Sequence, residues 1–206
     1  MNNAAGVAKT LLQIKAIKLS PHSPFTWASG IQSPIYCDNR ITLSHPEVRD
    51  YIKACLVESS KAFQPVQAIA GVATAGIPHG VLLADALRLP FVYVRGEAKG
   101  HGRKNQVEGE LNGNERVLVI EDLISTGGSS LRVVEVLREL GCEVAGVLAI
   151  FSYGFESAIM AFRSAACPLN TLTDYNTLID EAVKSNYISA EDLQQLLAWR
   201  EMTGVA

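Results

Sequence analysis

The stretch that decides the fold is Val-Leu-Val-Ile-Glu-Asp-Leu-Ile-Ser-Thr-Gly-Gly-Ser, residues 117–129. Its four apolar residues, 117–120, predict a buried strand, and Gly128 begins a pattern that predicts a helix. Two carboxylates, Glu121 and Asp122, follow the strand at once. In an open parallel sheet, ligands bind beyond the carboxyl ends of the strands, where the N–H groups of a following helix can hold an anion. The stretch therefore predicts a phosphate site at the edge of such a sheet.

The turn after the strand, residues 125–129, combines hydroxyl groups with glycines that could wrap one phosphate. No Lys follows the glycines, which argues against a P-loop, and the missing G-x-G-x-x-G argues against a dinucleotide fold. Glu121 and Asp122 are placed to accept hydrogen bonds from vicinal hydroxyls or to face a metal-bound diphosphate. An ordinary capped turn would explain the glycines but not the adjacent carboxylates. The pattern favours a site for a phosphorylated ribose.

Strand-length apolar runs alternate with stretches of helical period along most of the chain. The predicted strands span 66–72, 91–94, 117–120 and 143–151, and the predicted helices between them span 76–89 and 128–140. This alternation predicts the α/β class, with an open, mostly parallel sheet flanked by helices. Residues 96–114 hold five glycines and no sustained period, which predicts a long loop between two strands.

Helical patterns also occur near both ends of the chain. The apolar residues of the first pattern are Leu11, Leu12, Ile14, Ile17 and Leu19. They predict an amphipathic helix, and the lysines between them exclude the apolar core of a signal peptide. Ser44 and Glu47 predict a capping box for a second helix, and Ser189 with Asp192 predicts the same for the final helix.

Composition limits the classes of function. The 206 residues are 48% hydrophobic and 19% charged, which is typical of one compact globular unit. A net charge of −3 offers no broad basic field, which argues against nucleic acid as a partner. The four cysteines stand far apart without a C-x-x-C pair, which argues against a zinc site. No apolar run is long enough to cross a bilayer, so we expect a cytoplasmic protein without a membrane partner.

Residues 117–129 closely resemble the 5-phosphoribosyl 1-pyrophosphate binding signature of the type I phosphoribosyltransferases. The resemblance covers nearly the whole chain and implies that family's fold, with a small N-terminal hood beside the sheet. It implies one domain spanning 1–206, in which residues 1–45 form the hood and residues 95–114 form a mobile lid loop. It assigns 5-phosphoribosyl 1-pyrophosphate binding to Arg95, Lys99, His101, Glu121, Asp122, Leu123, Ile124, Ser125, Thr126, Gly127, Gly128 and Ser129.

The opening of the long loop resembles the lid of one branch of this family, the orotate phosphoribosyltransferases. Arg95, Lys99 and His101 are spaced to place positive charges over one anionic ligand, and the surrounding glycines allow the loop to open and close. A solvated basic loop is the alternative, and it is preferred for Arg103 and Lys104. The resemblance makes Lys99 and His101 catalytic, and it implies that Arg95 reaches the neighbouring active site of a homodimer.

Residues 25–40 resemble the hood of the same branch. Tyr36 could stack on a planar pyrimidine, although core packing is an equal alternative for Tyr36 and is preferred for Trp27. The resemblance places Ser125 and Tyr36 at the orotate. Where some members have an Arg for the orotate carboxylate, this chain has Ser-Tyr-Gly at 152–154, which makes Arg40 the candidate for that carboxylate.

A third loop, residues 71–78, follows a strand and opens a helix, so its backbone N–H groups could hold pyrophosphate. A plain turn is the alternative. The pyrophosphate residues of this loop are Ala73, Thr74, Ala75 and Gly76. Many relatives carry Lys where this chain has Ala75, and some carry Lys where it has Gly96 or Ala28. Fewer cations would then face the pyrophosphate.

The reaction implied by the resemblance moves phosphoribose from 5-phosphoribosyl 1-pyrophosphate to orotate, giving orotidine 5′-monophosphate and pyrophosphate in pyrimidine biosynthesis. Asp122 would act in catalysis with Lys99 and His101. The implied cofactor is Mg²⁺, held mainly by the substrate and water rather than by a carboxylate cage. A phosphoribosyltransferase for another base and a non-catalytic regulator of the same fold are the alternatives.

Overall fold

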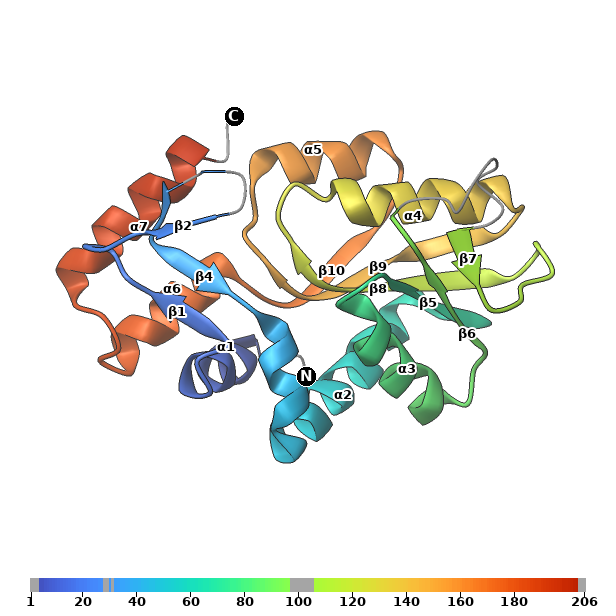
Figure 1. The fold of residues 1–206 in the computed structure, drawn as a ribbon, viewed down its shortest axis with the longest axis horizontal. Coiled ribbons are helices and arrows are strands. Elements are labelled where there is room, and N and C mark those ends of the chain that lie inside the picture. The colour runs from blue at the N-terminus through green and yellow to red at the C-terminus, as the bar shows by residue number, and fades with distance from the viewer. Residues whose placement is uncertain (1–3, 28–29, 31, 97–105, 204–206) are drawn as a thin grey trace.

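The structure, a computed structural model, describes residues 4–27, 30, 32–96 and 106–203 (Figure 1). Its centre is a six-stranded sheet in the order β10-β9-β8-β5-β6-β7. The strands are β5 (Ala68–Val72), β6 (Phe91–Val94), β7 (Val107–Glu108), β8 (Arg116–Ile124), β9 (Glu143–Ser152) and β10 (Leu169–Asp174). Neighbouring strands run parallel except at one edge, where β7 pairs antiparallel with β6. The sheet is open and mostly parallel, as predicted.

Helices cover both faces of this sheet (Figure 1). One face carries α2 (Pro46–Ser60), followed by the short η2 (Lys61–Phe63), and α3 (Gly76–Leu87), and the other face carries α4 (Gly128–Glu139) and α5 (Glu156–Ser164). Within β8, Leu118 and Ile120 pack into the core that includes α2 and α3, whereas Val119 packs into the core of α4 and α5. Because both faces are buried, the strands are continuous apolar runs in the sequence.

The N-terminal segment lies beside the C-terminal helices, on the left of Figure 1. Its elements are α1 (Ala4–Gln13), β1 (Ile17–Leu19), β2 (Phe25–Thr26), β3 (Gln32–Ser33), β4 (Ile35–Cys37) and η1 (Asn39–Ser44), and the helices beside it are α6 (Tyr175–Lys184) and α7 (Ala190–Thr203). Helix α1 contacts α6. The described part of the predicted hood therefore adjoins the end of the chain, while its limit at residue 45 stays a prediction.

Pairing with neighbouring strands changes two predicted elements. Strand β8 continues to Ile124 instead of ending at residue 120, because its partner β9 pairs with it up to Ser152. Glu121 and Asp122 therefore lie inside the strand rather than after it. In the predicted loop 96–114, residues 107–108 form the edge strand β7 against β6.

The predicted N-terminal helix is too long at its carboxyl end. Helix α1 ends at Gln13, and Lys15 has a φ of 57°, a left-handed conformation that the helix cannot continue through. Ile17 and Leu19 then belong to β1, which pairs antiparallel with β4. The alternation of apolar residues over this short segment fitted both structures, and the pairing with β4 decides between them.

One of the two predicted capping boxes is wrong. Ser44 is the last residue of η1, and the residue before α2 is His45, which makes no side-chain capping bond. The box at the final helix is confirmed, because the N–H and Oγ of Ser189 donate to Oδ2 of Asp192 at 2.9 Å. The N–H of Asp192 donates back to Oγ of Ser189 at 3.1 Å.

Over the part of the chain that the structure describes, no helix combines the length and the apolar character that crossing a membrane requires.

Candidate functional site

The candidate site lies at the carboxyl ends of β5 and β8, which are neighbours in the sheet. The chain continues from β5 to β6 on one side and from β8 to β9 on the other, so the strand order reverses between them. Such a switch point is where open α/β sheets bind their ligands. The start of α3 approaches β8 closely, since a Cβ on Gly76 would overlap the carbonyl oxygen of Ile120. Only glycine allows this contact.

Two adjacent acidic side chains form the centre of the site. Glu121 is 5% exposed, and its Oε1 accepts the N–H of Asp122 at 3.0 Å. Its Oε2 accepts the hydroxyl of Ser130 at 3.2 Å. Burial, together with the neighbouring negative charge of Asp122, raises the pKa of Glu121 well above its ordinary value. Burial likewise raises the pKa of Asp122.

This pairing gives the centre a clear electrostatic preference. Two buried carboxyl groups side by side repel one another when both are ionised. A positive charge arriving between or above them relieves that repulsion. The strand end is therefore poised to stabilise cationic character on a ligand.

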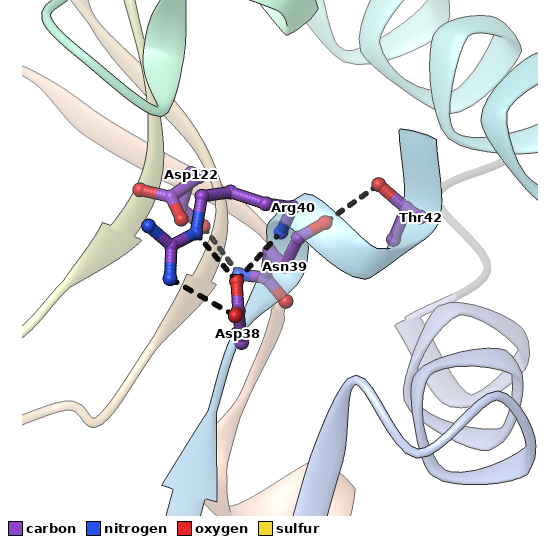
Figure 2. Close-up of polar contacts among 5 residues, drawn as sticks. All are labelled: Asp38, Asn39, Arg40, Thr42 and Asp122. Carbon is purple, nitrogen blue, oxygen red and sulfur yellow. Dashed lines mark hydrogen bonds and ion pairs between the residues drawn. The ribbon is translucent and has the colours of Figure 1, made fainter. Parts of the chain in front are cut away.

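The hood contacts this strand end through η1, as Figure 2 shows. The side-chain Nδ2 of Asn39 donates to the backbone oxygen of Asp122 at 2.7 Å, and Asn39 is fully buried. Beside it, Asp38 accepts two bonds from the guanidinium group of Arg40, from Nε at 2.6 Å and from Nη2 at 2.9 Å, and a third from the backbone N–H of Arg40 at 3.2 Å (Figure 2). These bonds lower the pKa of Asp38, and the positive charge of Arg40 acts in the same direction on Asp122. Sequence reasoning missed Asn39, because its partner is 83 positions away.

The phosphate loop, residues 125–129, begins where β8 ends and leads into α4. Gly127 has a φ of 80°, and a Cβ there would lie 2.6 Å from the ring of Phe162. The N–H of Leu131 donates to the Gly127 carbonyl at 2.9 Å, which closes the first turn of the helix. The N–H groups before that turn have no acceptor within the helix, so they are suited to an anion.

The predicted pyrophosphate loop has a defined path between β5 and α3. The N–H of Ala73 donates to the Val94 carbonyl at 3.0 Å, and the N–H of Ile77 donates to the Thr74 carbonyl at 3.2 Å. The peptide between Ala73 and Thr74 is cis. Ala75 precedes α3 without a side-chain cap. Among residues 73–76 only Thr74 has a side-chain donor, so most donors that the loop can offer are backbone N–H groups.

A cavity of about 410 Å³ opens beside the phosphate loop. Its lining residues are Thr26, Trp27, Tyr36, Cys37, Leu123, Ser125 and Tyr153. It brings together Tyr36 and Ser125, which the sequence predicted, but Arg40 is not part of its lining. Tyr36 is 40% exposed and therefore presents its ring to the opening. Trp27 both packs and lines the cavity, since its ring lies 5.2 Å from that of Tyr153.

Tyr153 is a site residue that sequence reasoning noted only as the place of a missing Arg. It stacks on Phe155 at 5.3 Å with an interplanar angle of 9°, and it is 2% exposed. Its position directly after β9, at the same sheet edge as the phosphate loop, was the signal that could have identified it.

The lid residues lie partly outside the described residues. Lys99 and His101 fall in the gap 97–105, as do Arg103 and Lys104. Arg95 is described at the end of β6, where its backbone N–H donates to the Gln106 carbonyl at 2.9 Å. Its Nε lies 3.3 Å from Oε1 of Glu108 in β7. The base of the predicted lid is therefore a β-hairpin.

Comparison with known proteins agrees with this geometry. Residues 41–158 match the model of the phosphoribosyl transferase domain. The chain is 55% identical over 196 residues to an orotate phosphoribosyltransferase of Porphyromonas gingivalis, covering 95% of this chain and 93% of that protein. It superposes on the crystal structure of orotate phosphoribosyltransferase from Aeropyrum pernix with a TM-score of 0.77 and 31% identity, over 89% of this chain and 99% of the other.

A longer protein shares the fold. The chain superposes on the UMP synthase of Leishmania donovani with a TM-score of 0.82, covering 97% of this chain and 42% of that protein. The identity is 24%, so this likeness concerns the fold alone.

Proposed function

Since the chain belongs to the orotate phosphoribosyltransferase family, we propose that it transfers phosphoribose from 5-phosphoribosyl 1-pyrophosphate to a ring nitrogen of orotate. The products are orotidine 5′-monophosphate and pyrophosphate, in pyrimidine biosynthesis. One observation supports this most directly. Ser125 belongs both to the phosphate loop and to the lining of the aromatic cavity. A sugar phosphate held by the loop therefore meets a base held in the cavity.

The acidic pair is proposed to act on the ribose. Displacement of pyrophosphate at the anomeric carbon develops positive charge on the sugar. Glu121 and Asp122 accept hydrogen bonds from the ribose hydroxyls, and the negative charge that the pair carries favours that developing charge over the neutral ground state. Asn39 holds the backbone of Asp122, so the pair keeps its place while the charge develops.

The leaving pyrophosphate is proposed to lie against the loop 73–76 and the lid. Backbone N–H groups of the loop bind its oxygens, and Lys99 and His101 neutralise the charge that appears as the bond breaks. Because Ala75 and Gly96 stand where relatives carry Lys, these lid residues and Arg95 take a larger share of that charge. Closure of the lid excludes water, which would otherwise hydrolyse the sugar phosphate.

Magnesium fits the site as an ion held mainly by the substrate. Within the described ranges, no group of three or more His, Cys, Asp or Glu is placed to hold a metal ion. Both carboxylate oxygens of Glu121 already accept hydrogen bonds within the protein, so Asp122 would be the carboxylate that contacts the ion. When bound, Mg²⁺ supplies positive charge to the diphosphate, and it keeps several water ligands.

The base is proposed to lie in the aromatic cavity, between Tyr36 and Tyr153, with Ser125 beside it. Stacking on flat rings suits a pyrimidine. For the orotate carboxylate we keep Arg40 as the proposed partner. Asp38 holds its Nε and Nη2, so its remaining N–H groups would make the contact.

Replacement of Arg40 tests that assignment. Arg40→Ala should raise the KM for orotate by about tenfold or more, the scale of a lost hydrogen bond to a charged group. Arg40→Lys keeps the charge but loses the forked geometry, so an intermediate value is expected. An unchanged orotate KM with a raised KM for 5-phosphoribosyl 1-pyrophosphate would instead indicate that Arg40 acts through Asp122 on the phosphorylated sugar.

The enzyme is proposed to be a cytoplasmic homodimer in which Arg95 reaches the partner's site. Mixing subunits tests this directly, because Arg95→Ala and Asp122→Asn proteins should each be weakly active alone. In a mixed dimer, the subunit with intact Asp122 receives Arg95 from the other subunit, and activity returns. Activity that stays at the level of the separate variants would show that Arg95 acts within its own subunit.

The reaction itself is tested by the ultraviolet loss of orotate on adding purified protein, 5-phosphoribosyl 1-pyrophosphate and magnesium. Uracil, adenine and hypoxanthine are run in parallel, and only orotate should be consumed. Turnover of another base would keep the fold and change the substrate. Binding of 5-phosphoribosyl 1-pyrophosphate without turnover of any base would indicate a non-catalytic regulator.

A further inference from the structure

Trp199 in the last helix, α7, lies directly behind the aromatic cavity. Its ring centre is 5.8 Å from that of Trp27, with an interplanar angle of 82°. It is 6.4 Å from that of Tyr153, with an angle of 69°. Trp27 and Tyr153 both line the cavity, whereas Trp199 does not. One side chain therefore supports two walls, one from the N-terminal segment and one from the end of β9.

A hydrogen bond ties the same residue to the hood. The indole Nε1 of Trp199 donates to the carbonyl oxygen of Gln32 in β3 at 3.0 Å. Strand β3 pairs with β2, whose residue Thr26 also lines the cavity. The hairpin that covers the base is thus held by α7 through a bond of defined direction as well as by ring contacts.

Helix α7 is itself anchored firmly enough to give this support. The fully buried Leu196 offers its carbonyl to the hydroxyl of Tyr175 at 2.9 Å, which joins α7 to the start of α6. The ring of Tyr175 also lies 6.0 Å from that of Trp199. At the other end of α7, Asp192 pairs with His22 of the N-terminal segment at 2.8 Å.

We propose that Trp199 is a positioning residue for the base, an inference that rests on the proposed function. It holds Tyr153 and the β2–β3 hairpin at the separation that a planar pyrimidine ring fills. The phosphate loop leads from β8 into α4, whereas α7 lies beside the N-terminal segment, away from α4 (Figure 1). Loss of Trp199 should therefore weaken binding of the base and leave binding of the phosphorylated sugar unchanged.

The test compares Trp199→Ala, Trp199→Phe and Met202→Ala. Met202 lies on the same helix and is 74% exposed, which makes it the matched control. Trp199→Ala should raise the KM for orotate by about tenfold, the scale of losing base–aromatic contact. The KM for 5-phosphoribosyl 1-pyrophosphate and the kcat at saturating orotate should stay within about twofold. Trp199→Phe keeps a ring but loses the N–H, so a smaller rise is expected.

The outcomes separate the two proposals. A wild-type protein that does not consume orotate would overturn the proposed function. A wild-type protein that consumes orotate, with an unchanged orotate KM in both Trp199 variants, would overturn the role of Trp199. An equal rise in both substrate constants would also overturn it, because that result indicates a general loss of structure. If Trp199→Ala does not fold, Trp199→Phe decides by the same comparison.

Tryptophan fluorescence gives a second test, because the chain has only two tryptophans, Trp27 and Trp199. In Trp27→Phe, Trp199 is the only indole, and its emission should change when orotidine 5′-monophosphate binds. Pyrophosphate alone should leave the emission unchanged. Identical emission with and without orotidine 5′-monophosphate at saturation would contradict a position behind the cavity.

Discussion

The phosphate loop and the aromatic cavity share an edge of the sheet but are built in opposite ways. The loop and its acidic pair come from consecutive residues, 121–129, of one strand and one helix start. The cavity takes its walls from the hood, from β8 and from the end of β9, with α7 behind them. Under the proposed function, the contrast teaches that the sugar phosphate is recognised by local backbone and charge, and the base by tertiary arrangement. Substitutions in the two regions should therefore affect different substrates and different constants.

The largest effect is expected for Asp122→Asn. Removing the charge beside the developing positive charge should lower kcat by about 10²- to 10³-fold, the scale of one lost preorganised electrostatic group. The assay is orotate consumption at saturating substrates. Asp50→Asn is the control, because Asp50 is an exposed residue of α2 that pairs with Lys53. A kcat within fivefold of the wild type would break the assignment of charge stabilisation to this region.

Lys99→Ala should lower kcat by about 10²-fold, since one stabilising cation at the leaving group is lost. Lys104→Ala in the same loop is the matched control and should leave kcat near the wild-type value. Rates of pyrophosphate release measure both. Near-normal turnover of Lys99→Ala would refute the lid assignment.

Gly76→Ala tests the close approach of the start of α3 to β8. A Cβ there would overlap the Ile120 carbonyl oxygen, so the free energy of unfolding should fall by about 1–3 kcal/mol. Gly96→Ala is the control, because a Cβ at Gly96 meets nothing within 4 Å, and a change below about 0.5 kcal/mol is expected. Urea unfolding of both variants provides the comparison. If Gly76→Ala loses no more unfolding free energy than Gly96→Ala, α3 and β8 can move apart without cost and the close contact is not required.

Tyr36→Ala should act on the cavity alone. Losing one stacking face should raise the KM for orotate by about five- to tenfold and leave the KM for 5-phosphoribosyl 1-pyrophosphate within about twofold. Tyr187→Ala is a matched control, since both tyrosines are 40% exposed. If the two substrate constants rise together in Tyr36→Ala, the separation between loop and cavity is wrong.

The smallest effect concerns stability as a function of pH. Burial raises the pKa of Glu121 from 4.5 to about 8, so the folded protein without ligand keeps a proton that the unfolded chain releases. Stability from this group is therefore lost as pH rises from 4.5 towards 8. Glu121→Gln lacks that slope, so its Tm should rise relative to that of the wild type by at least about 2–4 °C between pH 5 and pH 8. Each unit by which the pKa is raised is worth about 1.4 kcal/mol, and one kcal/mol gives that change in Tm for a chain of this size.

Thermal unfolding of both proteins from pH 5 to pH 8.5, without ligands, measures the difference. The Tm of Glu121→Gln should exceed that of the wild type by more as the pH rises. If the Tm of the wild type instead rises relative to that of Glu121→Gln with rising pH, Glu121 is ionised and paired in the folded protein.

Much of the fold was predictable from local pattern. The strands and helices that alternate along the chain and the Ser189–Asp192 cap are indicated by residues close in sequence, and the structure confirms them as well as the mostly parallel sheet that the alternation predicted. The errors occur where partners far along the chain decide. The extension of β8 depends on β9, and the assignment of residues 17–19 to a strand depends on β4.

The candidate site divides in the same way. The phosphate loop and acidic pair are one motif, and its residues lie together in the structure. Asn39, Tyr153 and Trp199 reach the site only through tertiary contacts with residues that no local pattern relates to them. No spacing rule connects such residues, so their contribution can be identified only from the folded structure.

The position of α7 also fixes an order of events during synthesis. The ribosome completes β8, the phosphate loop and β9 well before it reaches Trp199. The anion-binding turn therefore has its residues in place while the support behind the base is still untranslated. A nascent or prematurely terminated chain that stops before α7 has the residues of the proposed phosphate turn but lacks the support that we propose for the base.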